Sequence, residues 1–324
     1  MKLIFIGTAD FATPSLCSVA QEHDLELVVT QPDRPSGRGM KPSRSPVKKQ
    51  ARELDLPVFQ PENINSEESL EKIEKIDPQG FVLAAYGQKI SGNFLDLVHW
   101  PVNIHGSLLP NYRGAAPINW AVIRGEDVTG VTTIIMDEGL DSGPILLKGE
   151  TEIGENETAG ELHDRLANMA GDLVLRTLAG LEEGTVEPKT QKGEPTYAPK
   201  LTKEDGLVNW NEPSTDVHNL IRGTSPWPGA YTFLDCQKVK VHRSRDLGKL
   251  QGELSNKLPL RGGGKDIEPG EVIDSGQLGL VVKCGRNTAV ELTRVQLPSK
   301  SEMSGTDFVN GYHLETGDRF TGRD

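Results

Sequence analysis

An amide, an imidazole and a carboxylate occur in this chain at spacings that could bring them to one reaction centre. Asn103 and His105 are two positions apart in an extended segment, so their side chains point to the same face. Asp141 lies further along, in the turn-rich segment DEGLDSGP (137–144). Open parallel sheets bind ligands at the carboxyl ends of their strands, and these three side chains could form one pocket there.

These residue types suit the transfer of an acyl or formyl group to an amine. The oxygen of the attacked carbonyl gains negative charge, and Asn103 and a protonated His105 can donate hydrogen bonds to it. One such donor lowers the barrier by ~3–4 kcal/mol. Asp141 would stabilise an imidazolium and could accept the proton of the amine. Each residue also has an ordinary structural explanation, as a strand-end histidine, a turn asparagine or a capping aspartate. Only the joint pattern favours chemistry.

The elements that would position these side chains alternate between strands and helices. We expect strands at residues 2–6, 25–30, 58–59, 81–85, 100–105 and 131–136, and helices at 14–22, 47–54, 66–76, 117–124 and 158–181. Residues 81–85 (FVLAA) are wholly apolar, as in a strand buried on both faces. Thr158 and Glu161 fit a capping box at the longest helix. This alternation predicts an α/β fold with a mostly parallel, twisted sheet.

The second half of the chain has a different composition and a different pattern of apolar runs. Residues 185–206 are rich in Pro, Gly, Lys and Thr, which is typical of a linker. Short β-rich runs follow at 231–234, 238–242, 270–273, 278–283 and 289–295, with turn residues between them. Such spacing predicts a small β-barrel. Residues 248–270 include three consecutive glycines and predict a mobile loop.

The charge is distributed unevenly. The net charge is −12, yet residues 1–204 hold 20 basic and 31 acidic residues while residues 205–324 hold 15 and 16. Residues 34–52 contain seven basic residues and no acidic one, namely Arg34, Arg38, Lys41, Arg44, Lys48, Lys49 and Arg52. A local basic stripe matters more to a polyanion than the total charge. A solvated surface loop is the other interpretation, and residues 238–245 are a second basic candidate.

The apolar runs, the first residues and the cysteines of the chain bear on the cellular compartment of the protein. No apolar run approaches the ~18 residues of a membrane span, and the start of the chain does not resemble a signal peptide. Three scattered cysteines without a CxxC pair predict neither a disulfide framework nor a zinc site. We therefore expect a protein of the reducing cytoplasm with no metal and no membrane partner. We also expect a monomer, although none of these features bears on the oligomeric state.

Two segments, NIHGSLLPNYRGAAPI (103–118) and GLDSGPIL (139–146), resemble the 10-formyltetrahydrofolate-dependent formyltransferase family. Further segments are similar to those members of the family that formylate methionyl-initiator tRNA: IFIGTADFATPSL (4–16), QPDRPSGRG (31–39), TYAPKLTKEDGLVNW (196–210) and IRGTSPWPGA (221–230). The resemblance covers nearly the whole chain. It implies formyl transfer from 10-formyltetrahydrofolate, a co-substrate, to the free amino group of methionyl-initiator tRNA.

The resemblance also implies a fold and a set of site residues. The fold is a doubly wound, formyltransferase-like catalytic domain at residues 1–188, a linker at 189–205, and a smaller OB-like β-barrel that binds tRNA at 206–324. The catalytic residues would be Asn103, His105 and Asp141. Folate would contact Ser107, Leu108, Leu109 and Pro110, and more loosely Gln88 and Ile90. The tRNA would contact Arg34, Arg38, Lys41 and Arg44, with Arg38 the leading candidate.

Three alternatives remain beside this interpretation. One is formyl transfer to glycinamide ribonucleotide or to an amino sugar nucleotide, which the catalytic trio alone does not exclude. Another is a nicotinamide-dependent dehydrogenase, but the turn at 7–10 (GTAD) lacks the G-x-G-x-x-G pattern. The third is a non-catalytic RNA-binding protein, in which the trio would have no catalytic role.

Overall fold

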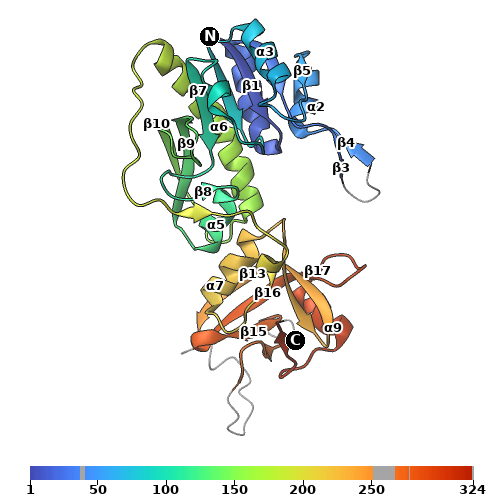
Figure 1. Ribbon diagram of the computed structural model, residues 1–324. Helices are drawn as coiled ribbons and strands as arrows, with labels where there is room; N and C mark the ends of the chain where they lie inside the picture. The colour runs from blue at the N-terminus through green and yellow to red at the C-terminus, as the bar shows by residue number, and fades with distance from the viewer. Residues whose placement is uncertain (37–40, 251–266, 277, 323–324) are drawn as a thin grey trace. The chain divides into compact units, whose positions relative to one another are not determined.

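The computed structural model describes residues 1–36, 41–250, 267–276 and 278–322. They form two compact units. Unit 1 comprises residues 1–117, 128–152 and 163–199, and unit 2 comprises residues 118–127, 153–162 and 200–324. Figure 1 shows their elements along the chain. The loop expected at 248–270 falls mainly on residues outside the described ranges.

Unit 1 is built round a seven-stranded, mostly parallel sheet. In spatial order its strands are β10 (Ile145–Glu152), β9 (Val128–Ile135), β7 (Trp100–His105), β6 (Gly80–Ala84), β1 (Lys2–Gly7), β2 (Asp24–Val29) and β5 (Val58–Phe59). The strands from β7 to β5 run parallel, while β9 is antiparallel to both β7 and β10. The carboxyl ends of the five parallel strands therefore meet at one edge.

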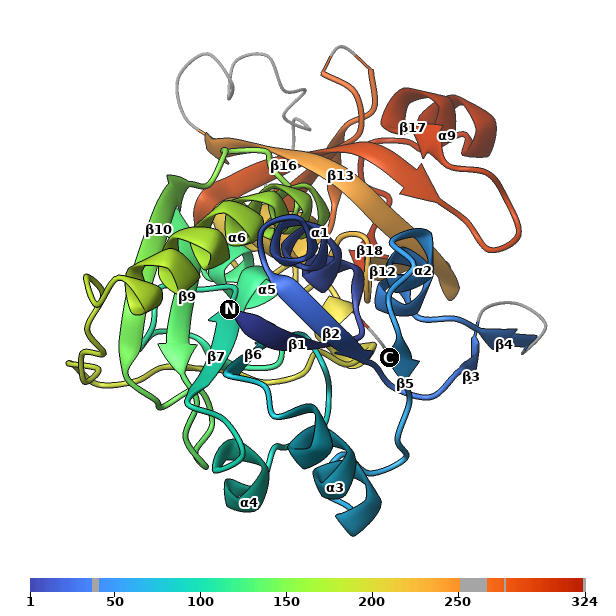
Figure 2. The same ribbon diagram turned by 90° about the horizontal axis from the view of Figure 1, so that it is seen from above.

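Helices cover both faces of this sheet, so the doubly wound α/β fold is confirmed. Helices α1 (Thr13–Glu22) and α6 (Ala159–Glu182) lie on one face, and α3 (Glu67–Ile76) and α4 (Gly92–Leu95) lie on the other (Figure 2). Ile4 and Ile6 of β1 pack in one buried cluster with Ile73, Phe81 and Phe94. The remaining helical pieces before α6 are the 3-10 turn η1 (Asp10–Ala12), α2 (Pro46–Glu53) and α5 (Pro117–Ile123).

Local capping signals set the starts of two predicted helices. At α3, the Ser66 hydroxyl accepts a hydrogen bond from Ser69 N at 3.3 Å. At α6, the Thr158 hydroxyl accepts from Glu161 N at 3.3 Å, and the Glu161 carboxylate accepts from Thr158 N at 2.9 Å. The capping box expected from the sequence is therefore present.

The Glu161 carboxylate also gives unit 2 a pH-dependent ion pair, with Arg243 at 2.6 Å. Hydrogen bonds from Arg243 and then from Thr158 lower the pKa of Glu161 to about 2. A depressed carboxyl pKa stabilises the fold above the unfolded pKa near 4.5, and this stability is lost as pH falls toward 2. Both side chains are well exposed, so solvent screening keeps the contribution below about 1 kcal/mol.

We therefore expect Glu161→Gln to reduce the fall in Tm between pH 4.5 and pH 2. Thermal unfolding monitored by circular dichroism at several pH values measures this. Glu183→Gln, an exposed change just beyond α6, is the control and should follow the wild-type curve. Superimposable curves for wild type and Glu161→Gln would contradict the prediction.

Unit 2 is an antiparallel barrel, which confirms the predicted β-barrel class. Its strands in spatial order are β14 (Val272–Asp274), β15 (Val281–Cys284), β16 (Thr288–Gln296), β13 (Gln237–Lys249), β12 (Ala230–Leu234) and β18 (Phe320–Thr321), with β17 (Met303–Ser304) paired to β16. Backbone bonds from Val272 N to Asp318 O and from Phe320 N to Gly270 O, both 2.8 Å, join the two end strands. Because these bonds connect the edges, the sheet closes on itself.

Helices that the sequence did not predict complete the core of unit 2. Helix α7 (Ser214–Gly223) contributes Val217 and Ile221, and α9 (Gly305–Tyr312) contributes Phe308. Two short 3-10 turns, η2 (Glu204–Gly206) and η3 (Gly285–Asn287), complete the described elements. In the described ranges, no helix has both the length and the apolar character that a membrane span requires.

The segment predicted as a linker is bound to unit 1 over much of its length. Ile145 and Lys189 exchange backbone hydrogen bonds of 2.7 and 2.8 Å. Further on, β11 (Tyr197–Ala198) pairs in parallel with β8 (Arg113–Gly114). We call residues 189–198 the strap. Backbone groups make these bonds, so the composition of the segment gives no sign of them.

Candidate active site

The structure brings the three predicted catalytic side chains together. Asn103 and His105 end β7, and Asp141 lies in the turn between β9 and β10. Asp141 Oδ1 is 3.5 Å from Asn103 Nδ2 and 3.7 Å from His105 Nδ1. Asn103 and His105 are only 7% and 6% exposed. One small reacting group can therefore contact all three side chains.

The hydrogen bonding of His105 defines which ring nitrogen faces the site. Its Nε2 is 2.8 Å from the carbonyl oxygen of Tyr112. A carbonyl only accepts, so Nε2 carries a hydrogen and Nδ1 is the atom that faces Asp141. His105 can donate from Nδ1 only as an imidazolium, and Asp141 Oδ1 lies 3.7 Å from that nitrogen.

Asp141 is held in an unusual backbone conformation, with φ of 48°. Its Oδ2 accepts a hydrogen bond from Gly114 N at 2.9 Å, and its main-chain carbonyl accepts from Gln191 Nε2 at 2.7 Å. Gly143 leaves no space for a side chain, because an added Cβ would lie 1.8 Å from the Ile135 oxygen. Gln191 was not predictable from the sequence, since an isolated glutamine in a linker-like segment belongs to no periodic pattern or motif.

The predicted folate segment after β7 has two inward and two outward residues. Ser107 is fully buried and donates to the Asn111 carbonyl at 2.6 Å. Leu109 is also fully buried, whereas Leu108 and Pro110 are partly exposed. Ser107 and Leu109 therefore shape the turn, and Leu108 and Pro110 are the side chains that a ligand can reach.

The loop after β6 presents backbone more than side chains. The amide of Gln88 donates to the Glu62 carbonyl at 3.1 Å and accepts from Ile64 N at 3.0 Å. Ile90 is buried in the core. Gly87, in contrast, is exposed with φ of 91° and has open space beside it. Any ligand contact at 86–90 would therefore come chiefly from the main chain.

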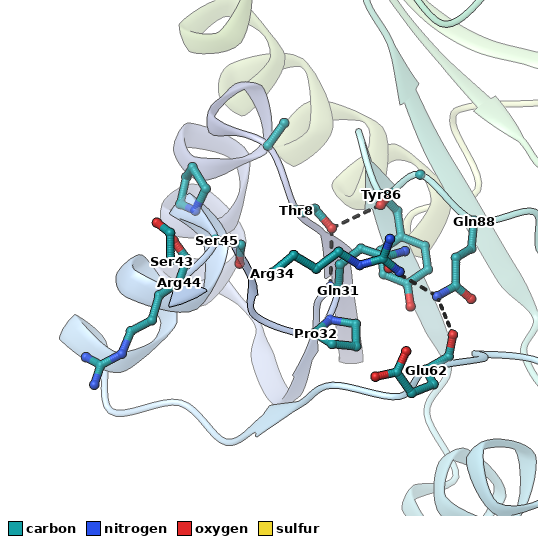
Figure 3. A pocket seen from close by; sticks show the side chains of 13 residues that line it. Thr8, Gln31, Pro32, Arg34, Ser43, Arg44, Ser45, Glu62, Tyr86 and Gln88 are labelled. Carbon is teal, nitrogen blue, oxygen red and sulfur yellow. Dashed lines mark hydrogen bonds between the residues drawn. The ribbon is translucent and has the colours of Figure 1, made fainter. Parts of the chain in front are cut away.

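A pocket of about 570 Å³ opens at the same edge of the sheet. Thr8, Gln31 and Tyr86, which follow β1, β2 and β6, form its floor (Figure 3). The Thr8 hydroxyl donates to the Tyr86 carbonyl at 3.0 Å. The Tyr86 hydroxyl is buried without a hydrogen-bond partner among the described residues, and burial raises its pKa to about 12. Arg34 and Arg44 line the rim.

The first part of the basic stripe forms a two-stranded ribbon, and its last three basic residues lie on α2. Strands β3 (Arg34–Ser36) and β4 (Lys41–Ser43) are antiparallel, with Pro35 opposite Pro42. Antiparallel pairs alternate between positions that use amide donors and positions that do not, so a ribbon tolerates such a proline pair. Arg34 and Arg44 are exposed, and Arg44 points away from the other pocket residues (Figure 3). Arg38 lies outside the described residues.

Several other predicted basic residues are already paired. Lys48 is 8% exposed and bonds to the Asp33 carboxylate at 2.6 Å. In the second basic run, Arg243 and Arg245 each lie 2.6 Å from a carboxylate, of Glu161 and Glu291 respectively. These ion pairs favour the ribbon over β13 as the cationic surface that is open to a polyanion.

Family comparisons agree with this architecture. The family model for formyl transferase matches residues 1–178, and the model for the formyl transferase C-terminal domain matches residues 200–313. With the doubly wound sheet and the polar trio, these matches define a formyl transferase. In the described part of the chain, no cluster of three His, Cys, Asp or Glu side chains is arranged to bind a metal.

Curated relatives identify the family more narrowly. Methionyl-tRNA formyltransferases of Clostridium botulinum (strain Alaska E43 / Type E3) and Clostridium perfringens (strain 13 / Type A) are each 42% identical to this chain. The matches cover 97% and 98% of this chain and 98% and 99% of the relatives. The chain belongs to the methionyl-tRNA formyltransferase family.

Solved structures of lower identity share the fold. An N-formyltransferase from Helicobacter canadensis, in complex with folinic acid and dTDP-3-aminofucose, has a TM-score of 0.65 at 17% identity, over 92% of this chain and 100% of that chain. HypX from Aquifex aeolicus, in complex with tetrahydrofolic acid, has a TM-score of 0.60 at 18% identity, over 100% of this chain and 51% of that chain. At these identities the similarity concerns the fold alone.

Proposed function

We propose that this chain transfers the formyl group of 10-formyltetrahydrofolate to the amino group of methionyl-initiator tRNA, giving N-formylmethionyl-tRNA for translation initiation. The trio of Asn103, His105 and Asp141 carries the proposal, because Asp141 Oδ1 lies 3.5 and 3.7 Å from its two partners. Relatives of this chain are named methionyl-tRNA formyltransferases.

The chemistry follows from what each side chain can donate or accept. The folate co-substrate supplies an activated one-carbon acyl group. As the amine of the acceptor bonds to the formyl carbon, Asn103 Nδ2 and His105 Nδ1–H donate to the oxygen that becomes negative. Asp141 accepts the proton that the amine loses. The C–N bond to folate then breaks, and the departing nitrogen takes up that proton, which restores the Asp141 carboxylate.

The folate is proposed to lie beside the outward residues of the turn after β7. Leu108 and Pro110 supply apolar contacts, and the main chain near Gly87 supplies hydrogen bonds. Pockets of this kind combine apolar walls with a few fixed polar groups. Ser107, Leu109, Gln88 and Ile90 then act by holding these two loops in shape.

The tRNA is proposed to contact the ribbon and the C-terminal barrel. Arg34 and Arg44 are exposed cations at the rim of the pocket, so their phosphate contacts would guide the acceptor end toward the edge of the sheet that holds the trio. Arg38 and Lys41 join this proposal through the sequence resemblance alone. The domain bounds of 1–188, 189–205 and 206–324 belong to the same proposal.

We place the enzyme in the cytoplasm, as a monomer. Cys17, Cys236 and Cys284 are free thiols in the structure, which suits a reducing compartment. Sedimentation of the purified chain would test the monomer.

The phosphate-contact proposal predicts the behaviour of Arg44→Ala. We expect KM for methionyl-tRNA to rise about 5- to 10-fold with little change in kcat, because one phosphate contact contributes to binding and not to chemistry. The slope of log(kcat/KM) against log salt should fall by about 0.7–0.9. Steady-state assays across salt concentrations measure both, with Arg176→Ala, an exposed change on α6, as the control. An unchanged slope would remove Arg44 from the interface.

The proposed activity is tested by a competition among acceptors. Purified protein is given 10-formyltetrahydrofolate together with methionyl-tRNA, glycinamide ribonucleotide or an amino sugar nucleotide, and the formylated product is quantified. We expect methionyl-tRNA to be formylated far faster than the two small acceptors. Faster reaction with either small acceptor, or no formylation at all, would overturn the proposal.

A further inference from the structure

The strap is attached to both ionisable members of the trio. Its Thr196 hydroxyl accepts a hydrogen bond from Tyr112 N at 2.8 Å, and the carbonyl of Tyr112 is the acceptor for His105 Nε2. The Thr196 carbonyl accepts from Arg113 N at 2.9 Å. This pairing orders the turn that also presents Gly114 N to the Asp141 carboxylate.

Gln191 makes the most direct of these attachments. Its Nε2 donates to the main-chain carbonyls of Asp141 and Gly143, at 2.7 and 2.8 Å. Its Oε1 accepts from Arg113 Nη2 at 2.7 Å and from Arg113 Nε at 3.3 Å. Both donors and the acceptor of the amide are therefore used, and the group is fixed between the turn at 113 and the loop at 141–143.

The loop that carries Asp141 needs such an attachment. A non-glycine residue in the left-handed region is strained, and it stays there only when its surroundings hold it. The neighbouring Leu140 is 60% exposed, so packing on that side does little to hold the loop. Gln191 replaces this missing packing with two hydrogen bonds to the main chain on either side of Ser142.

We propose that Gln191 is a positioning residue for formyl transfer, which holds the Asp141 carboxylate at its distance from His105 and Asn103. The inference rests on the proposed function, because it concerns the same reaction. Gln191 contacts neither reacting group, and its effect passes through the backbone of Asp141. A shift of about 1 Å in a catalytic group can lower the rate by about 100-fold.

Gln191→Glu is the sharpest test of this role. The carboxylate can still accept from Arg113, but it cannot donate to the carbonyls of Asp141 and Gly143. We expect kcat for methionyl-tRNA to fall about 10- to 100-fold, as for a misplaced catalytic group. KM for tRNA and for the folate should stay within about threefold, because the binding surfaces are unchanged. Gln191→Ala, which removes both functions of the amide, should show the same split.

The controls separate this inference from the proposed function. Glu194→Ala changes an exposed residue of the same strap and should leave kcat and KM at wild-type values. Failure of the wild-type enzyme to formylate methionyl-tRNA would reject the function itself. An active wild type with Gln191→Glu within twofold of its kcat would reject the positioning role, as would a loss that lies wholly in KM. If Gln191→Ala does not fold, Gln191→Glu alone decides the matter, since it keeps the bonds to Arg113.

Discussion

Asn103→Ala is expected to lower kcat for formyl transfer about 100- to 1,000-fold, the usual cost of removing one donor from an oxyanion site. Asn103 Nδ2 and His105 Nδ1 lie 3.5 and 3.7 Å from the same carboxylate oxygen, so both donors can reach one small group bound beside it. The bond from Asn103 to Asp141 is long, at 3.5 Å, so alanine removes little structural bonding. Single-turnover formylation with excess enzyme measures the chemical step.

Binding measurements separate this effect from a loss of structure. The Kd for methionyl-tRNA should stay within about threefold of wild type, because the donor acts on the transition state. Asn111→Ala, which alters an exposed side chain in the following turn, should keep wild-type kcat. Equal losses in kcat and in tRNA affinity would contradict an oxyanion role for Asn103.

The strands of unit 1 were predictable because their burial leaves a clear pattern. Residues 81–84 are buried on both faces of the sheet, so the run is continuously apolar. Strand β10 escaped prediction because it lies at the sheet edge, where polar residues alternate along its exposed face. Sequence patterns report burial, and only one of the 8 residues of β10 is buried.

Helix α7 was missed for a different reason. Its buried face includes polar residues such as His218, Asn219 and Arg222, so few apolar residues mark that face in the sequence. Hydrogen bonds satisfy these groups, as from Arg222 Nε to Asn219 at 2.9 Å and between His218 Nδ1 and Ser244 Oγ at 2.9 Å. A hydrophobic pattern in the sequence does not record hydrogen-bond partners of this kind, whether they lie near or far along the chain.

Some residues of the site were predictable from the sequence, and others were not. The placement of Asn103 and His105 followed from strand periodicity and the position of the strand end. The contacts that support the site did not follow from such patterns: the Tyr112 carbonyl bonds to His105, and the Gln191 amide bonds to the main chain of Asp141. A carbonyl is present at every residue, and Gln191 reaches Asp141 across 50 positions of sequence. The sequence thus reveals the reacting side chains more readily than the groups that hold them.

Asp141→Asn is expected to lower kcat about 100- to 10,000-fold, the range associated with a general base. The substitution keeps the size of the side chain, and its oxygen can still accept from Gly114 N, which bonds to Asp141 Oδ2 at 2.9 Å. The other end becomes an NH2 group that faces the Asn103 amide and His105 Nδ1. It can neither accept a proton from the amine nor stabilise an imidazolium, so both functions are lost together.

Asp137→Asn provides a matched control in the same loop. Asp137 Oδ1 accepts from Gly139 N at 3.0 Å and from the Ser142 hydroxyl at 2.8 Å, and an asparagine oxygen can keep both bonds. We expect this variant to retain kcat within a few fold, and both variants to unfold near the wild-type Tm. A proton acceptor at Asp141 is excluded if Asp141→Asn keeps more than about a tenth of wild-type kcat, because a general base contributes at least about 100-fold. The carboxylate would then act only as the structural partner of Gly114.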